Sequence, residues 1–247
     1  MSAVFSIARH EARRIFVSPL AWSVLAVIQF IMGLSFFLLL GEMASNPGAL
    51  NQYQGVSDYI GGGLFGFSAV LLLLIVPLMT MRLFAEDRKS GSLTLLTTAP
   101  ASLTEIVLGK FLGLSVFFLA VLVLMAGMAF SLIGGTELDV GRMIAGLIGQ
   151  LLLMLSFGAA GLFVSTLTKE PVIAAVGAFG LLLVVWLLEA MAYSGGMFAD
   201  LFRHLSLIGH FEKLRRGVFD TADIAYYVLF ITLFLWLAVQ RLDIERS

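Results

Sequence analysis

The sequence predicts an all-α integral membrane protein that forms a single transmembrane domain over residues 1–247. Of the 247 residues, 60% are hydrophobic and only 13% are charged, whereas soluble domains average about 45–50% and about 25%. The mean hydropathy is +1.02. Six apolar runs each approach the length of about 20 residues that a helix needs to cross the bilayer core. We place these spans at about residues 20–40, 64–84, 106–132, 143–167, 172–193 and 222–239.

The first element expected is an amphipathic helix over residues 4–17, before the first span. Its cationic face would carry His10, Arg13 and Arg14. Such a helix lies in the membrane interface, with its cations toward anionic head groups. It either anchors the first span or contacts a cytoplasmic partner, and both roles can hold together. Ser18-Pro19 then ends the helix. The expected apolar face consists of Val4, Phe5, Ala8, Ala12, Ile15 and Phe16.

Six spans place both termini on the same side of the membrane. With that side assigned to the cytoplasm, most of the 15 lysines and arginines fall inside, as the positive-inside rule requires. We therefore expect a multi-pass membrane protein with both termini cytoplasmic. Residues 194–221, between the last two spans, are the exception because they hold most of the outer cations. They are also rich in apolar residues, which predicts short re-entrant or interfacial helices there.

Between the second and third spans lies the polar segment, residues 82–110. Gly91 can adopt the left-handed conformation that ends a helix, and Ser92 can then cap a new short helix that ends at Pro100. Ser102 and Glu105 match a capping box that starts the third span. The outward leucines of the short helix would be Leu93, Leu95 and Leu96. The sequence thus predicts a crosswise helix held at both ends, with an apolar face suited to docking.

The polar segment resembles the hallmark of permease subunits of the type-two ABC exporter family. That pattern reads approximately acidic-x-x-x-G-[ST]-hydrophobic-x-x-L-x-[ST]-x-P-[VA]-[ST], followed by an acidic residue and a closing G-K, and in this chain four residues separate Glu86 from Gly91. The matching positions are Glu86, Gly91, Ser92, Leu93, Leu96, Thr98, Pro100, Ala101, Ser102, Glu105, Gly109 and Lys110. A second stretch is similar to the gliding-motility branch of that family. Its positions are His210, Phe211, Glu212, Arg216, Gly217, Asp220, Asp223, Tyr226 and Tyr227.

This resemblance implies a permease that dimerises and binds a separate ABC ATPase subunit. The crosswise helix would be the coupling helix, and ATP and magnesium would be held by the ATPase. Expected coupling residues are Glu86, Arg88, Gly91, Ser92, Leu93, Leu95, Leu96, Thr98, Pro100, Ser102 and Glu105. The branch also implies a membrane-anchored extracytoplasmic protein as a possible partner. Residues expected to contact it are His210, Phe211, Arg216 and Gly217.

Other classes of function have less support in the sequence. No G-x-x-x-x-G-K-[ST] motif follows Gly61-Gly62-Gly63, so we expect no nucleotide chemistry and no cofactor in this chain. A net charge of −1 argues against nucleic acid, zero cysteines exclude thiolate metal ligands, and the three histidines are scattered. We expect no catalytic residues and no metal. A permease for nitrous oxide reductase maturation, a membrane anchor that only recruits soluble proteins and an intramembrane enzyme remain alternatives.

Four further features inside the spans have structural interpretations. Pro77 is expected to kink the second span, and the small residues 158–161 suit close helix packing. Gln29 and Gln150 are expected to form hydrogen bonds between helices. Glu189 lies toward the outer end of the fifth span, where a charge costs little.

Overall fold

The computed structural model describes residues 3–46, 48, 53, 55–92, 101–135, 138–192 and 199–246. All regular elements among these residues are α-helices. They are α1 (Ala3–Val17), α2 (Pro19–Ser45), α3 (Val56–Thr80), α4 (Ala85–Lys89), α6 (Leu103–Phe130), α7 (Val140–Ser165), α8 (Pro171–Ala192), α9 (Ala199–Leu205), α10 (Leu207–Arg215) and α11 (Thr221–Arg246).

Six helical stretches in the described residues are long and apolar enough to cross a membrane, which confirms the predicted number of spans. They are Pro19–Ser45, Val56–Lys89, Leu103–Phe130, Val140–Ser165, Pro171–Met191 and Thr221–Glu245. Four bounds lie at least five residues beyond the approximate ones expected: the ends of the first, second and last spans and the start of the second. The second span begins at Val56 rather than at 64, because Asp58 pairs with Arg142 of α7 and does not end the helix. The last span continues beyond 239 because its polar end pairs with α4.

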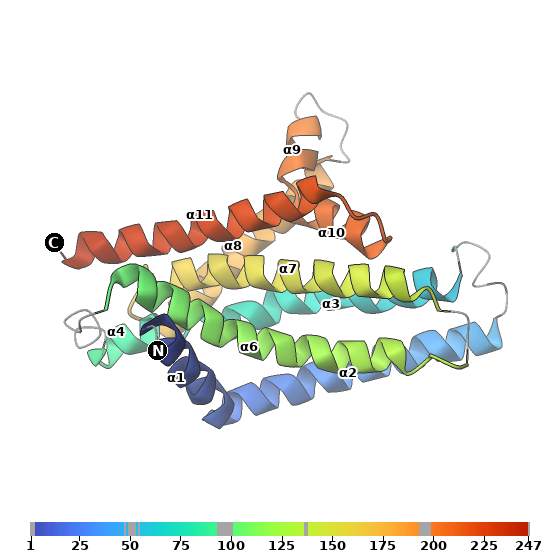
Figure 1. The fold of residues 1–247 in the computed structure, drawn as a ribbon, viewed down its shortest axis with the longest axis horizontal. Helices are drawn as coiled ribbons and strands as arrows, with labels where there is room; N and C mark the ends of the chain where they lie inside the picture. The colour runs from blue at the N-terminus through green and yellow to red at the C-terminus, as the bar shows by residue number, and fades with distance from the viewer. Residues whose placement is uncertain are drawn as a thin grey trace.

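The long helices run side by side, and both chain termini lie at one end of the bundle together with α4 (Figure 1). We call this end the terminal end. The short helices α9 and α10 connect α8 to α11 away from it, on the opposite side of the bundle from α1 (Figure 1). Both helices lie in the region for which short helices are predicted, and α10 packs against α7.

The centre of the bundle is α7, the most buried of the six spans. Its small residues admit large side chains from its neighbours. A Cβ added at Gly146 would lie 2.6 Å from the ring of Phe65 on α3, and one at Gly158 would lie 2.7 Å from Phe118 on α6. Close packing of the predicted small-residue patch is therefore present. Gln150 is fully buried, but its side-chain amide makes no hydrogen bond in the structure, so the predicted interhelical bond is wrong.

The N-terminal helix packs against α6 more extensively than any other two helices pack. Its contact face contains Ala8, Glu11 and Ile15, all buried. Phe5 of the expected apolar face is 57% exposed, as a side chain directed at lipid would be, while Glu11 is only 3% exposed. The face turns in this direction because Glu11 finds a cation on α6. As expected, α1 ends at Ser18, whose hydroxyl caps α2 by accepting the Leu20 amide hydrogen.

Candidate functional site

The first helix of the polar segment is α4, and Ser165 fixes its start to the end of α7. The Ser165 hydroxyl oxygen accepts hydrogen bonds from the backbone amides of Phe84 and Ala85, each at 3.0 Å. The same hydroxyl donates to the carbonyl of Met81 at 3.2 Å. One fully buried side chain thus satisfies three backbone groups in the turn between α3 and α4, where helical hydrogen bonds are interrupted. These three hydrogen bonds tie the turn before α4 to the end of α7.

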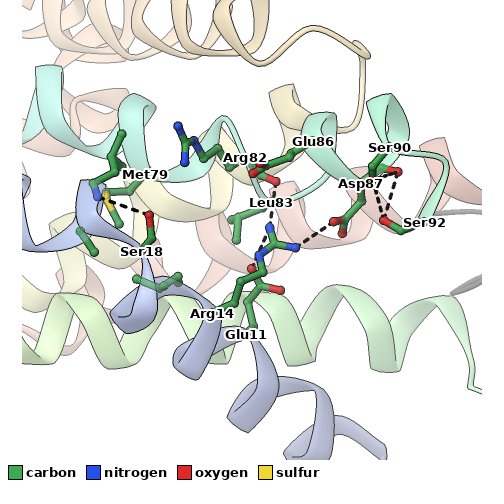
Figure 2. A pocket seen from close by; sticks show the side chains of 13 residues that line it. Glu11, Arg14, Ser18, Met79, Arg82, Leu83, Glu86, Asp87, Ser90 and Ser92 are labelled. Atoms are coloured by element: carbon green, nitrogen blue, oxygen red, sulfur yellow. Dashed lines mark hydrogen bonds and ion pairs between the residues drawn. The ribbon is translucent and has the colours of Figure 1, made fainter.

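Four charged side chains form a closed ring between α1, α4 and α6, which we call the charge ring. Lys110 Nζ lies 2.6 Å from Asp87 Oδ2 and 3.1 Å from Glu11 Oε2. Arg14 lies 2.8 Å from Asp87 Oδ1 and 3.2 Å from Glu11 Oε1, so each cation touches both carboxylates. Figure 2 shows Glu11 and Arg14 reaching from α1 toward Asp87 on α4. The ring joins the N-terminal helix to the start and the finish of the polar segment.

Three of the four members of the charge ring are buried, and the Arg14 side chain is 34% exposed. Lys110 is 2% exposed, Glu11 3% and Asp87 5%. The ring carries two positive and two negative charges, so its net charge is zero. Loss of one member would leave a charge of the opposite sign without compensation. Burial by itself would lower the pKa of Arg14, but the carboxylates of Glu11 and Asp87 outweigh it and raise that pKa. Arg14 also donates to the carbonyl of Arg82 at 3.1 Å.

A pocket of about 410 Å³ opens beside the charge ring, between α1 and the turn into α4 (Figure 2). Its lining includes Arg14, Arg82 and Glu86. Glu86, one of the expected coupling residues, is exposed. The buried contacts of α4 are made by the adjacent Asp87. The pocket leaves the side of α4 accessible next to residues that hold it in place.

Two more ion pairs extend from α4 to other elements of the terminal end. Arg88, with a nearly buried side chain, pairs with Glu245 of α11. Lys89 lies 2.8 Å from Glu170, between α7 and α8, and both of these side chains are at least half exposed. An exposed pair of this kind contributes little to stability. Through these contacts α4 is tied to α1, α6, α7, α11 and the connection to α8.

The ends of the polar segment have the backbone features that the sequence predicts. Gly91 has a φ of 76°, the left-handed conformation that ends a helix most easily at glycine. Ser102 and Glu105 form the complete capping box: the Glu105 amide donates to the Ser102 hydroxyl, and the Ser102 amide donates to the Glu105 carboxylate at 2.8 Å. The Ser92 hydroxyl donates to the carbonyl of Asp87 at 3.3 Å.

The rest of the predicted crosswise helix lies outside the described residues and stays a prediction. These residues are Leu93, Leu95, Leu96, Thr98 and Pro100. The sequence reasoning missed Glu11 and Asp87 as site residues and included Lys110 only as part of a motif. For Glu11 and Lys110 a feature nearby pointed to the contact, whereas nothing in the sequence separates Asp87 from Glu86. Glu11 interrupts an otherwise small or apolar helix face, and Lys110 follows Gly109, where an added Cβ would meet Ile7 of α1 at 2.7 Å.

A second polar cluster lies where α9, α10 and α11 meet. His210 Nδ1 is 2.5 Å from Asp223 Oδ1, and His210 Nε2 is 3.1 Å from the carbonyl of His204. Both partners accept hydrogen bonds, so both contacts are satisfied only when the ring carries two protons. Lys213 Nζ lies 3.1 Å from the same Asp223 oxygen, and the ring of Tyr226 stacks on His210 at 4.3 Å.

The residues predicted to contact an extracytoplasmic partner do not form one surface. Phe211 is 1% exposed and packs inward toward Gly149 of α7. Arg216 and Gly217 are exposed, and His210 is partly buried in its contacts with α9 and α11. Phe211 therefore holds α10 against the bundle, and only its neighbours remain available to another protein.

Six helices long and apolar enough to cross a membrane, with a short polar helix linked by ion pairs between the second and third, define a multi-pass membrane protein. A family model described as "ABC-2 family transporter protein" matches residues 41–211, which include α4 and the whole polar segment. The chain belongs to the ABC-2 transporter family. It is thus a permease subunit of an ABC transporter, a class that works with an ABC ATPase. No curated protein matches the chain.

Proposed function

We propose that this permease receives the movement of its ATPase through the polar segment and distributes it to the bundle through α4 and the charge ring. In this proposal the terminal end faces the cytoplasm of a bacterial cell, and the chain lies in the inner membrane. ATP and magnesium belong to the partner subunit. The chain itself hydrolyses no nucleotide and holds no cofactor.

The observation that carries the proposal is the number of elements tied to α4. A force applied to residues 93–100 reaches α4 on one side and the capped start of α6 on the other. From Asp87 it passes to α1 and α6, and from Arg88 to α11. Ser165 passes it to α7 at the bundle centre. A free, solvated loop would need none of these buried contacts.

The remaining parts of the proposal follow from the family resemblance. Permeases of this kind work in pairs, so we propose a homodimer with one ATPase on each half. The stretch from His210 to Tyr227 favours the gliding-motility branch, in which a membrane-anchored extracytoplasmic protein receives the movement. In this chain that stretch forms α10 and the start of α11, and exposed Arg216 is its most accessible cation.

Co-purification with the cognate ABC ATPase tests the proposal. The permease should retain the ATPase, and reconstitution into nanodiscs should change the rate of ATP hydrolysis. Leu95→Asp should abolish both effects, because a carboxylate on the predicted docking face cannot be desolvated against an apolar groove. Leu167→Asp is the matched control, since Leu167 is exposed at the end of α7, next to the Ser165 that holds α4. If Leu95→Asp retains the ATPase as well as Leu167→Asp does, the polar segment is not its binding site.

A further inference from the structure

A cavity of about 460 Å³ lies between the end of α8 and the helices α9 and α10. It is far from the charge ring, since α9 and α10 lie away from the terminal end (Figure 1). Charged side chains of both signs line it: Arg203 from α9, Lys213, Arg216 and Glu212 from α10 and the following turn, and the partly exposed Glu189 from α8. The Glu212 carboxylate is already paired with Arg215, 2.5 Å away. This volume is in the range of small-ligand sites.

The cations of this cavity have unused hydrogen-bonding capacity. Arg203 is exposed, and within the described part of the chain no ion pair includes it. Arg216 has only a 3.9 Å contact with Glu212. Lys213 donates one hydrogen bond to Asp223, and its side chain is 53% exposed. Three cations with free donors around one cavity suit a phosphate group, whose oxygens accept several charge-assisted hydrogen bonds.

Glu189 requires a hydrogen-bond donor from the ligand, whereas the three cations require an acceptor. Its Oε2 atom is buried and has no hydrogen-bond partner in the structure. The same oxygen faces α10 at Gly209, where an added Cβ would lie 2.9 Å from it. A buried carboxylate oxygen without a donor is unfavourable, and an ammonium group with N–H donors would satisfy it. The cavity therefore matches a ligand that carries a phosphate and a primary ammonium together.

The surroundings of the cavity identify the source of such a ligand. Val218, which lines the cavity, is 56% exposed, and three apolar residues within two positions of a lining residue in the chain are exposed as well: Leu201 at 54%, Leu205 at 43% and Phe219 at 53%. They lie in α9 and in the turn after α10, next to the end of the membrane span α8. Acyl chains would cover these side chains while a head group enters the cavity.

We propose that this cavity binds the head group of a phospholipid with a primary amine, of the phosphatidylethanolamine type. The phosphate contacts Arg203, Lys213 and Arg216, and the ammonium donates to Glu189. This site is separate from the coupling role of the polar segment. It would fix α9 and α10 relative to the lipid leaflet at that end of the bundle.

Native mass spectrometry of the purified full-length chain tests the site directly, with no ATPase present. Three lipids with the same acyl chains are titrated: phosphatidylethanolamine, phosphatidylcholine, whose quaternary ammonium has no N–H donor, and phosphatidylglycerol, which has no cation. The ethanolamine lipid should bind roughly tenfold more tightly than the other two. A difference of this size in affinity corresponds to one charge-assisted hydrogen bond, the one that its ammonium donates to Glu189. Equal binding of all three lipids, or no binding above bulk detergent exchange, would overturn the proposal.

Two variants assign the contacts. Glu189→Gln should remove the preference for the ethanolamine lipid, and Arg203→Gln should weaken all three lipids several-fold. Lys169→Gln is the matched control, because Lys169 is an exposed cation at the terminal end, and it should bind as the wild type does. Retention of the preference in folded Glu189→Gln, verified by its thermal midpoint, contradicts the role of Glu189. Arg203 is on the surface of α9, so its variant tests the site even if Glu189→Gln does not fold.

Discussion

Replacing Lys110 by methionine removes the central cation of the charge ring and keeps a side chain of similar length. Lys110 is 2% exposed and lies within 3.1 Å of both Glu11 and Asp87. After the replacement Arg14 remains beside both carboxylates, but one positive charge must then balance two buried negative charges. One carboxylate is left without compensation.

Removing one partner of a buried ion pair costs about 3–5 kcal/mol, and we expect Lys110→Met to fall in this range. The control is Lys89→Met on the short helix α4. Lys89 pairs with Glu170, but the two side chains are 59% and 50% exposed, so its loss should cost less than about 1 kcal/mol. Two lysines at the ends of one segment should therefore differ several-fold in their effect.

Reversible unfolding in mixed micelles, followed by helical circular dichroism, measures this difference. A second variant, Asp87→Asn in the Lys110→Met background, removes the stranded charge and should recover a substantial part of the loss, because neighbouring sites are not additive. The reasoning is refuted if Lys110→Met unfolds within about 0.5 kcal/mol of the wild type, as a surface substitution does. It is also refuted if the double variant is no more stable than Lys110→Met.

Two further predictions concern the contacts around the ring. Gly113→Ala should weaken the packing of α1 on α6 and lower the thermal midpoint, because the new Cβ would lie 2.6 Å from Glu11 Cβ. The control is Gly127→Ala on the same helix. Its new Cβ would meet nothing within 4 Å, so this variant should be neutral or stabilising. Ser165→Ala leaves two buried amides without an acceptor and should cost about 1–3 kcal/mol. Ser156→Ala, whose buried hydroxyl has no partner, should change stability little, and equal losses at both serines would contradict the assigned role of Ser165.

The outline of the fold could be predicted from the sequence because it rests on local signals. Six apolar runs, the break at Ser18-Pro19, the left-handed Gly91 and the Ser102–Glu105 capping box all depend on residues close in the chain. Each is present in the structure. The helix of the second span begins earlier than the approximate bound, at Val56, and its Asp58 pairs with Arg142, which is distant in sequence.

The charge ring could not be predicted because its contacts are long-range. Glu11 and Lys110 are 99 positions apart, and Arg14 and Asp87 are 73 apart. A helix pattern assigns charged residues to the solvent face, so Glu11 was left out of the buried face although it is 3% exposed. The adjacent acids Glu86 and Asp87 have the same chemistry, and only the direction of α4 determines which of them is buried. Phe211, similarly, was expected to meet a partner, yet α10 turns it inward.

The most direct test of the account is where the ATPase touches the permease. A photo-crosslinking amino acid is placed at Leu96 in the polar segment and, separately, at Leu201, which is 54% exposed on α9. Illumination of cells that also contain the ATPase should crosslink it to position 96 and not to position 201. Crosslinking from position 201 with none from position 96 would place the ATPase at the other end of the bundle and contradict both the orientation and the role of the polar segment.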